Sequence, residues 1–133
     1  MGRKASRDVL FKLMFELCFH QVDADSYYDH LFDDGENENV DKDLLQNMYI
    51  DIIGKQDELK QSVSKYIKGY TIDRVYKVDL AILMLAVYEL QYTDTKTEIV
   101  ANEAVELAKK YSTDKSSKFI NGVIAAAVKD IRK

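Results

Sequence analysis

Cationic and aromatic side chains that could contact RNA gather in two parts of this 133-residue chain. In the first part, Lys109 and Lys110 precede a polar stretch that leads to Lys118 and Phe119. The second part is the N-terminus, where residues 1–12 hold four cations and one acid. Lysine and arginine neutralise phosphates, and aromatic rings stack on unpaired bases. These two parts of the chain are therefore candidate nucleic-acid contacts.

The overall charge of −4 conceals a strong segregation of charge along the chain. Residues 23–43 hold nine acids and one lysine, so the rest of the chain carries four more cations than acids. Residues 109–133 alone hold seven cations and two acids. An acidic sequence pI of about 5.2 therefore does not exclude a polyanionic partner.

The residues that could do catalytic chemistry are few and are not suitably spaced. Cys18 falls on an apolar helical face, and His20 and His30 lie in or beside the acidic stretch. The sequence has no Gly-rich phosphate loop, no Cys and His cluster and no dinucleotide fingerprint. The acids at residues 23–43 lack the order of a calcium-binding loop. We therefore expect a protein that is not an enzyme and that uses no cofactor or metal.

The composition indicates one all-α domain that spans residues 1–133. Hydrophobic residues make up 47% of the chain and charged residues 32%, and there is no proline. Apolar spacing typical of helices predicts a compact bundle of about seven helices. The expected helices cover residues 4–20, 41–54, 59–69, 79–90, 95–111 and 115–131, with a short helix near 27–32 and a turn or short helix at 71–76.

The stretch Leu80–Leu90 is apolar on nearly every side, which is typical of a helix at the centre of a bundle. It is about half as long as the roughly 20 residues that a membrane span requires. No signal peptide precedes it, and the single cysteine cannot form an internal disulfide. The sequence therefore predicts a cytoplasmic protein that does not insert into membranes.

Two local patterns give finer expectations for the C-terminal half. Thr95 and Glu98 have the spacing of a capping box, which predicts a helix start at this point. Asn121 and Gly122 interrupt no helical period, so they are expected inside the last helix. A glycine inside a helix costs about 1 kcal/mol relative to alanine. We therefore expect another backbone to approach Gly122 closely, with Asn121 bonded across that contact.

The first helix combines basic and aromatic residues. Arg3 and Arg7 lie one turn apart at its start, where the helix dipole disfavours cations. They are either a solvated basic end or a site for phosphate. Phe11, Phe15 and Phe19 form a second apolar strip, which is either buried or offered to a partner.

Four motifs carry a resemblance to a known family. They are Arg3–Asp8, Leu83–Leu90, Asn102–Lys109 and Ser117–Val123. In this order and over nearly the whole chain, they resemble the NusB family of bacterial transcription antitermination proteins. The last two motifs in tandem are the most specific part of the match.

The resemblance implies a helical bundle of two packed subdomains that binds the single-stranded boxA element of ribosomal RNA leader transcripts. Its implied partners are NusE, a small-subunit ribosomal protein, and the antitermination complex of RNA polymerase. By position, the RNA-binding residues would be Arg3, Lys4, Arg7, Lys115, Ser116, Lys118 and Phe119. Residues that meet NusE or RNA would include Phe15, Asp73 and Asp79.

Three residues depart from the family pattern. Lys4 and Met84 stand where the family often has arginine, and Lys96 replaces a common proline. Other readings also remain open: a helical protein-binding adaptor without RNA binding, a homodimer formed through exposed aromatic rings, and an RNA-binding module like the one fused to RNA cytosine methyltransferases. The chain is too short to include the methyltransferase, and its end after a complete last helix favours a whole protein.

Overall fold

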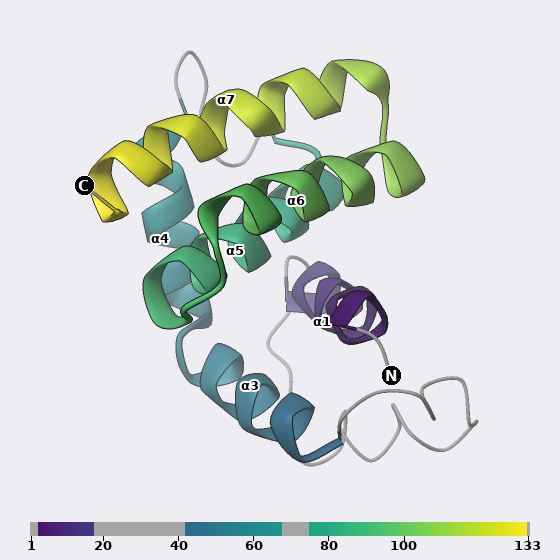
Figure 1. Cartoon of the computed structure of the whole chain (residues 1–133), viewed down its shortest axis with the longest axis vertical. Coiled ribbons are helices and arrows are strands. Elements are labelled where there is room, and N and C mark those ends of the chain that lie inside the picture. Colours follow the sequence, from purple (N-terminus) through teal and green to yellow (C-terminus); the bar gives the residue numbers. More distant parts are fainter. Residues whose placement is uncertain (1–2, 18–41, 68–74, 133) are drawn as a thin grey trace.

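The computed structural model describes residues 3–17, 42–67 and 75–132, and these form an all-α bundle (Figure 1). The expected fold class is confirmed. Six helices lie within the described residues: α1 (Arg3–Leu17), α3 (Lys42–Gly54), α4 (Gln56–Tyr66), α5 (Lys77–Tyr92), α6 (Thr97–Tyr111) and α7 (Asp114–Ile131). The expected short helix at 27–32, the first residue of the helix expected at 41–54 and most of the 71–76 segment lie outside the described residues.

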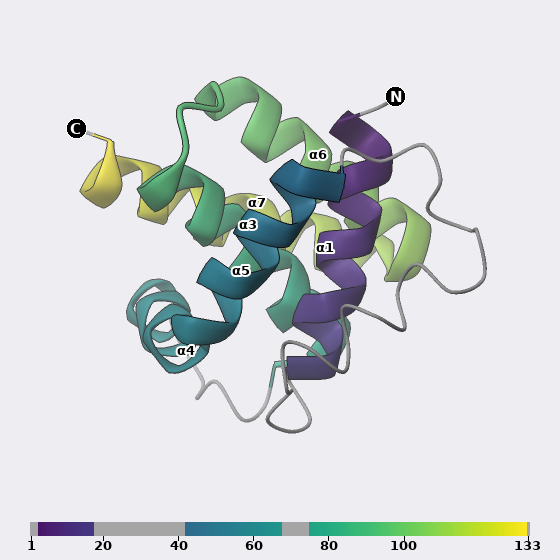
Figure 2. The same ribbon diagram turned by 90° about the horizontal axis from the view of Figure 1, so that it is seen from below.

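Helix α5 is the centre of the bundle, as its composition predicts. Every residue from Asp79 to Leu90 is buried. Helices α1 and α3 lie together on one side of α5, while α6 and α7 cover another side (Figures 1 and 2). Helix α4 packs against both α5 and α7. None of the described helices has the length and apolar composition needed to cross a membrane.

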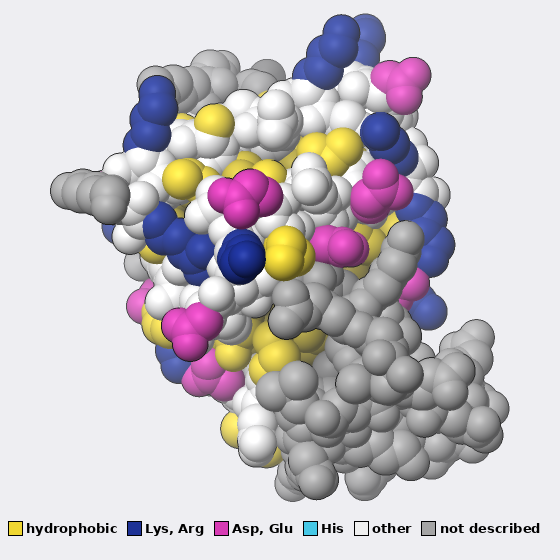
Figure 3. All heavy atoms as spheres, in the orientation of Figure 1, with side chains coloured by type: hydrophobic (Ala, Val, Ile, Leu, Met, Phe, Trp, Pro, Cys, Tyr) yellow, Lys and Arg dark blue, Asp and Glu magenta, His cyan; other side chains and the backbone are white. Residues whose placement is uncertain are grey.

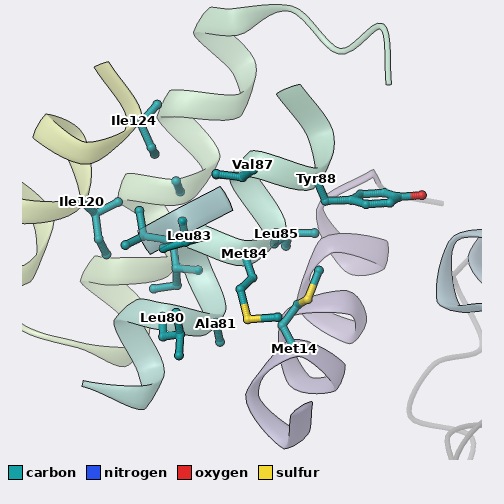
Figure 4. Packing of buried hydrophobic residues seen from close by; sticks show 14 of the residues in the cluster. Met14, Leu80, Ala81, Leu83, Met84, Leu85, Val87, Tyr88, Ile120 and Ile124 are labelled. Atoms are coloured by element: carbon teal, nitrogen blue, oxygen red, sulfur yellow. The ribbon is translucent and has the colours of Figure 1, made fainter. Parts of the chain in front are cut away.

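The core side chains on α5 project toward all of these neighbours. Figure 4 shows Met84 of α5 and Met14 of α1 pointing toward one another, and both are fully buried. Leu83 extends toward Ile120 and Ile124 of α7 in the same view. The departure at Met84 from the family's arginine thus places a flexible thioether in a position that is entirely packed.

The expected capping box at Thr95 and Glu98 is wrong. Helix α6 begins at Thr97, and Lys96 is its N-cap without a side-chain hydrogen bond. The Thr95 hydroxyl instead accepts a bond from Thr93 Oγ1 at 3.0 Å. Lys96 has a φ of −59°, which lies in the range that proline fixes. The lysine therefore preserves the backbone conformation that the family's proline would impose.

The expected close contact at Asn121 and Gly122 is also wrong. Both residues are exposed, and a Cβ atom built on Gly122 would meet nothing within 4 Å. They lie inside α7 as expected, but the buried side of that helix is formed by Ile120, Val123 and Ile124. The apolar period correctly predicts that the helix continues through these residues. It does not predict that Gly122 lies on the exposed side of α7.

Arg132, which follows α7, connects that helix to the end of α5 and to the segment before α6. Its Nη2 group donates to the carbonyl oxygens of Glu89 and Thr93 at 3.1 and 2.9 Å, and its Nε group donates to that of Leu90 at 3.1 Å. Its Nη1 group donates to the Thr95 carbonyl and, at 3.3 Å, to Thr97 Oγ1. One planar guanidinium thereby satisfies carbonyls at the end of α5.

Replacing Arg132 by lysine is expected to destabilise the protein although the charge is kept. A single ammonium group cannot donate to all of these carbonyl and hydroxyl oxygens, and a hydrogen bond to a charged group contributes about 1.5–3 kcal/mol. We expect a loss of about 2 kcal/mol in the free energy of unfolding, measured by urea denaturation. Lys129→Ala, an exposed change on the last turn of α7, is the control. Equal stability of Arg132→Lys and the unmodified chain would contradict this role.

The hydrogen bond of Tyr66 should make the protein less stable at alkaline pH. Its hydroxyl donates to Asp130 Oδ2 at 2.6 Å, and burial together with this acceptor raises the pKa of Tyr66 from 10.0 to about 12. Since the folded state holds the proton more tightly, the resulting stabilisation is complete below pH 10 and is lost as the pH rises toward 12. The difference in unfolding free energy between the unmodified chain and Tyr66→Phe should therefore shrink over that interval. A difference independent of pH would exclude this linkage.

Candidate nucleic-acid interface

The candidate interface is built on the corner between α6 and α7, which we define as residues 109–119. Helix α6 ends at Tyr111, and Thr113 caps the start of α7. The Thr113 hydroxyl accepts a bond from the Ser116 backbone N–H at 3.1 Å, which satisfies one of the free donors of the new helix. The chain therefore turns sharply, with Ser112 and Thr113 between the two helices.

A buried carboxylate fixes this corner to the start of α5. Ser112 and Ser116 each donate a hydroxyl to one oxygen of Asp79, both at 2.8 Å. Asp79 is 4% exposed and Ser116 is 3% exposed. Both carboxylate oxygens therefore have a donor, and Asp79 also lies in the first turn of α5, where the helix dipole favours an acid. The serine at a predicted RNA-binding position thus faces inward.

The lysines of the corner face outward. Lys109, Lys115 and Lys118 are exposed, and Phe119 is half-buried against the core. In Figure 3, Lys and Arg side chains gather along the right-hand edge, over the end of α6 and the start of α7, with a few acids among them. Within the corner, four lysines are accompanied by one acid, Asp114. This edge can attract a polyanion.

Helix α1 docks against the end of α6. Lys110 Nζ lies 2.9 Å from Asp8 Oδ2, and this bond raises the pKa of Lys110. The ring of Phe11 stacks on that of Tyr111, with centroids 4.7 Å apart. The basic start of the chain is therefore attached to the helix that leads into the corner, although about 100 residues separate the two in sequence.

The other predicted site residues are placed as follows. Arg3, Lys4 and Arg7 belong to the first two turns of α1. Phe15 is half-buried on the same helix, and its ring stacks on Phe11 with centroids 6.3 Å apart. Asp73 lies outside the described residues.

An open hollow of about 650 Å³ lies beside the corner. Its most exposed aromatic residue is Tyr76, directly before α5, with 71% of its surface accessible. The residues around the hollow are Tyr76, Asp79, Thr113, Asp114, Lys115, Ser116 and Phe119. The hollow thus combines aromatic, cationic and acidic groups from two helices.

The family resemblance is borne out by comparison with known proteins. The sequence profile of the NusB family matches residues 3–129. The chain belongs to the NusB family. A transcription antitermination protein NusB from Acetivibrio thermocellus is 36% identical over 97% of this chain and 90% of its own length. Another from Staphylococcus aureus is 36% identical over 94% of this chain and 97% of its own length.

A solved structure of T. maritima NusB has the same fold. Its TM-score with this chain is 0.86 at 28% sequence identity, over 100% of this chain and 94% of the other. The helical arrangement around α5 is therefore that of a NusB protein over the full length compared.

Two features of this NusB-family site were not predicted from the sequence. The bonds between Asp79 and the two serines were missed, although an acid beside a long apolar run signals a need for buried donors. The exposed ring of Tyr76 was missed because its spacing from Ile72 and Val75 places it with the apolar residues of a turn or short helix. Only the packing of α5 distinguishes the exposed ring from the buried ones.

The bonds between Asp79 and Ser116 should be detectable as an energetic coupling. Asp79→Ala leaves two inward-facing hydroxyls without their acceptor, and we expect it to lower the free energy of unfolding by about 2 kcal/mol. In a double-mutant cycle with Ser116→Ala, bonded side chains typically give a coupling of about 0.5–3 kcal/mol. Asp114→Ala, which changes an exposed acid of the same corner, is the control. Additive effects of Asp79→Ala and Ser116→Ala would exclude the coupling.

Proposed function

We propose that this NusB-family chain is a transcription antitermination factor that binds boxA-type single-stranded RNA of ribosomal RNA leader transcripts. It acts in the cytoplasm with NusE and the antitermination complex of RNA polymerase. The names of its relatives support the general role in antitermination. The observation that carries the RNA-binding proposal is the outward-facing lysine group on a corner that a buried network holds in place.

The geometry of the corner favours binding because the cations are supplied by a backbone that is already ordered. Lys115 and Lys118 extend from the first turns of α7, whose start is fixed by the Thr113 cap and by the bond from Ser116 to Asp79. A preformed site loses less conformational entropy on binding than a flexible segment does. Counterions released from the RNA add a favourable, salt-dependent contribution.

The residues have distinct roles in this proposal. Phosphates are bound by Lys115 and Lys118 on one side and by the basic start of α1 on the other, and Phe119 offers part of its ring to a base. The α1 residues concerned are Arg3, Lys4 and Arg7. Ser116, a predicted RNA-binding residue, is 3% exposed, and in this proposal it contributes by positioning the corner through its bond to Asp79. Phe15, Asp73 and Asp79 remain predicted residues of the region that meets NusE or RNA, with Asp79 4% exposed and its carboxylate bonded to two serines.

Removing the two corner lysines tests the proposal directly. A boxA-type RNA is titrated against the unmodified chain and against Lys115→Ala/Lys118→Ala at several salt concentrations. Each lost phosphate contact should reduce the slope of log affinity against log salt by about 0.7, the value for single strands, and affinity should fall. Lys129→Ala, at the opposite end of the same helix, should leave both affinity and slope unchanged.

The same titration with NusE present separates the two function classes. An antitermination factor of this type should bind the RNA more tightly when NusE is bound, and the lysine variant should retain NusE while losing RNA. A protein-binding adaptor without RNA binding would instead bind NusE with no salt-dependent affinity for RNA. That result, or an unchanged affinity after removal of both lysines, would refute the RNA-binding proposal.

A further inference from the structure

The ring of Tyr76 is exposed although the backbone that carries it is ordered. Tyr76 is the N-cap residue of α5, and its carbonyl accepts a bond from the Leu80 backbone N–H at 2.9 Å. The next helical turn begins the fully buried part of the bundle. With 71% of its surface accessible, Tyr76 is the most exposed large hydrophobic residue among the described residues. A ring with most of its surface in water contributes little to packing within the chain.

The surroundings of Tyr76 suit a nucleotide better than an ion. The hollow beside it, about 650 Å³, lies within the size range of small-molecule sites and is also lined by Phe119 and Lys115. Of the acids around it, Asp79 is buried and bonded to serines, while Asp114 is exposed. Asp114 offsets the charge of Lys115 in the hollow, so a free phosphate is not selected there, whereas a neutral base is not repelled and its amino group can donate to the Asp114 carboxylate.

We propose that Tyr76 is a base-stacking residue, and that an unstacked base of the bound RNA enters this hollow against Tyr76 and beside Phe119 while its phosphate meets Lys115. This inference rests on the proposed RNA-binding function and extends it to the start of α5. The ligand that the hollow binds in this proposal is a base of single-stranded RNA. Stacking on an aromatic ring tolerates any base, since every base has a flat face.

The test compares Tyr76→Ala with Tyr76→Phe in titrations of a boxA-type single-stranded RNA, using the full chain. Loss of one stacking ring typically weakens single-strand binding by roughly 5- to 150-fold, so Tyr76→Ala should fall in that range. Tyr76→Phe keeps the ring and should bind within about twofold of the unmodified chain. The salt dependence of RNA affinity should be the same for the unmodified chain, Tyr76→Ala and Tyr76→Phe, because no phosphate contact is removed.

Tyr92→Ala is the control for loss of a tyrosine ring away from the hollow, because Tyr92 lies at the other end of α5, where its hydroxyl donates to Glu58 Oε1 at 2.8 Å. It should leave RNA affinity unchanged. Circular dichroism of each variant checks that the helices are intact. In parallel, the unmodified chain is photocrosslinked to the same RNA carrying 5-bromouridine at single positions, and a crosslink to Tyr76 at one position is expected.

The outcomes separate this inference from the proposed function. If the unmodified chain binds the RNA with the expected salt dependence but Tyr76→Ala binds equally well, the stacking site is refuted and the function stands. If Tyr76→Ala loses NusE but keeps RNA, the ring serves a protein contact and the inference is wrong. If the unmodified chain does not bind the RNA, both proposals fall together. Weaker binding by Tyr76→Ala alone, with a crosslink at Tyr76, supports the stacking site.

Discussion

The complete burial of the middle of α5 is the constraint on which the rest of the structure depends. Twelve consecutive residues, Asp79–Leu90, are shielded from water, so this part of the helix has no side on which it could face solvent. Such a helix is stable only when other helices surround it, and α1, α4, α6 and α7 do so. At about 25 cal/mol for each Å² of apolar surface removed from water, this burial is the main favourable contribution to folding.

Polar groups of α7 secure both ends of this apolar helix. Near the start of α7, Ser116 donates to Asp79 at the start of α5, and just after the end of α7, Arg132 donates to the last carbonyls of α5. The two helices therefore run in the same direction, and their relative position is fixed by hydrogen bonds as well as by packing. A buried carboxylate is costly unless its oxygens are bonded, and here both of them are. The same bonds that complete the core thus determine where the corner lysines project.

The sequence was sufficient to predict the helices but not the contacts between their ends. The apolar period correctly located the central helix, and the continuity of α7 through Asn121 and Gly122 was predicted against a strong turn signal. The start of α6 was misplaced, because Thr95 and Glu98 have the right spacing but the chain is still extended at Lys96. The contact between Asp8 and Lys110 could not be predicted, because sequence spacing carries no information about a partner so distant in the chain.

The contact between Asp8 and Lys110 also changes how the basic charge of the corner is understood. Counted along the sequence, the corner offers four lysines, but the charge of Lys110 is already balanced by α1. The cations available to a partner are therefore Lys109, Lys115 and Lys118. Lys115 lines the hollow, and Lys118 lies one turn further along α7. Since Asp79 anchors α7 at this point and Tyr76 lies one turn before Asp79, one buried carboxylate positions both the cations and the exposed ring. The positions of the cations and of the ring are therefore coupled through the core, and cations combined with aromatic rings are the pairing that single-strand binders use.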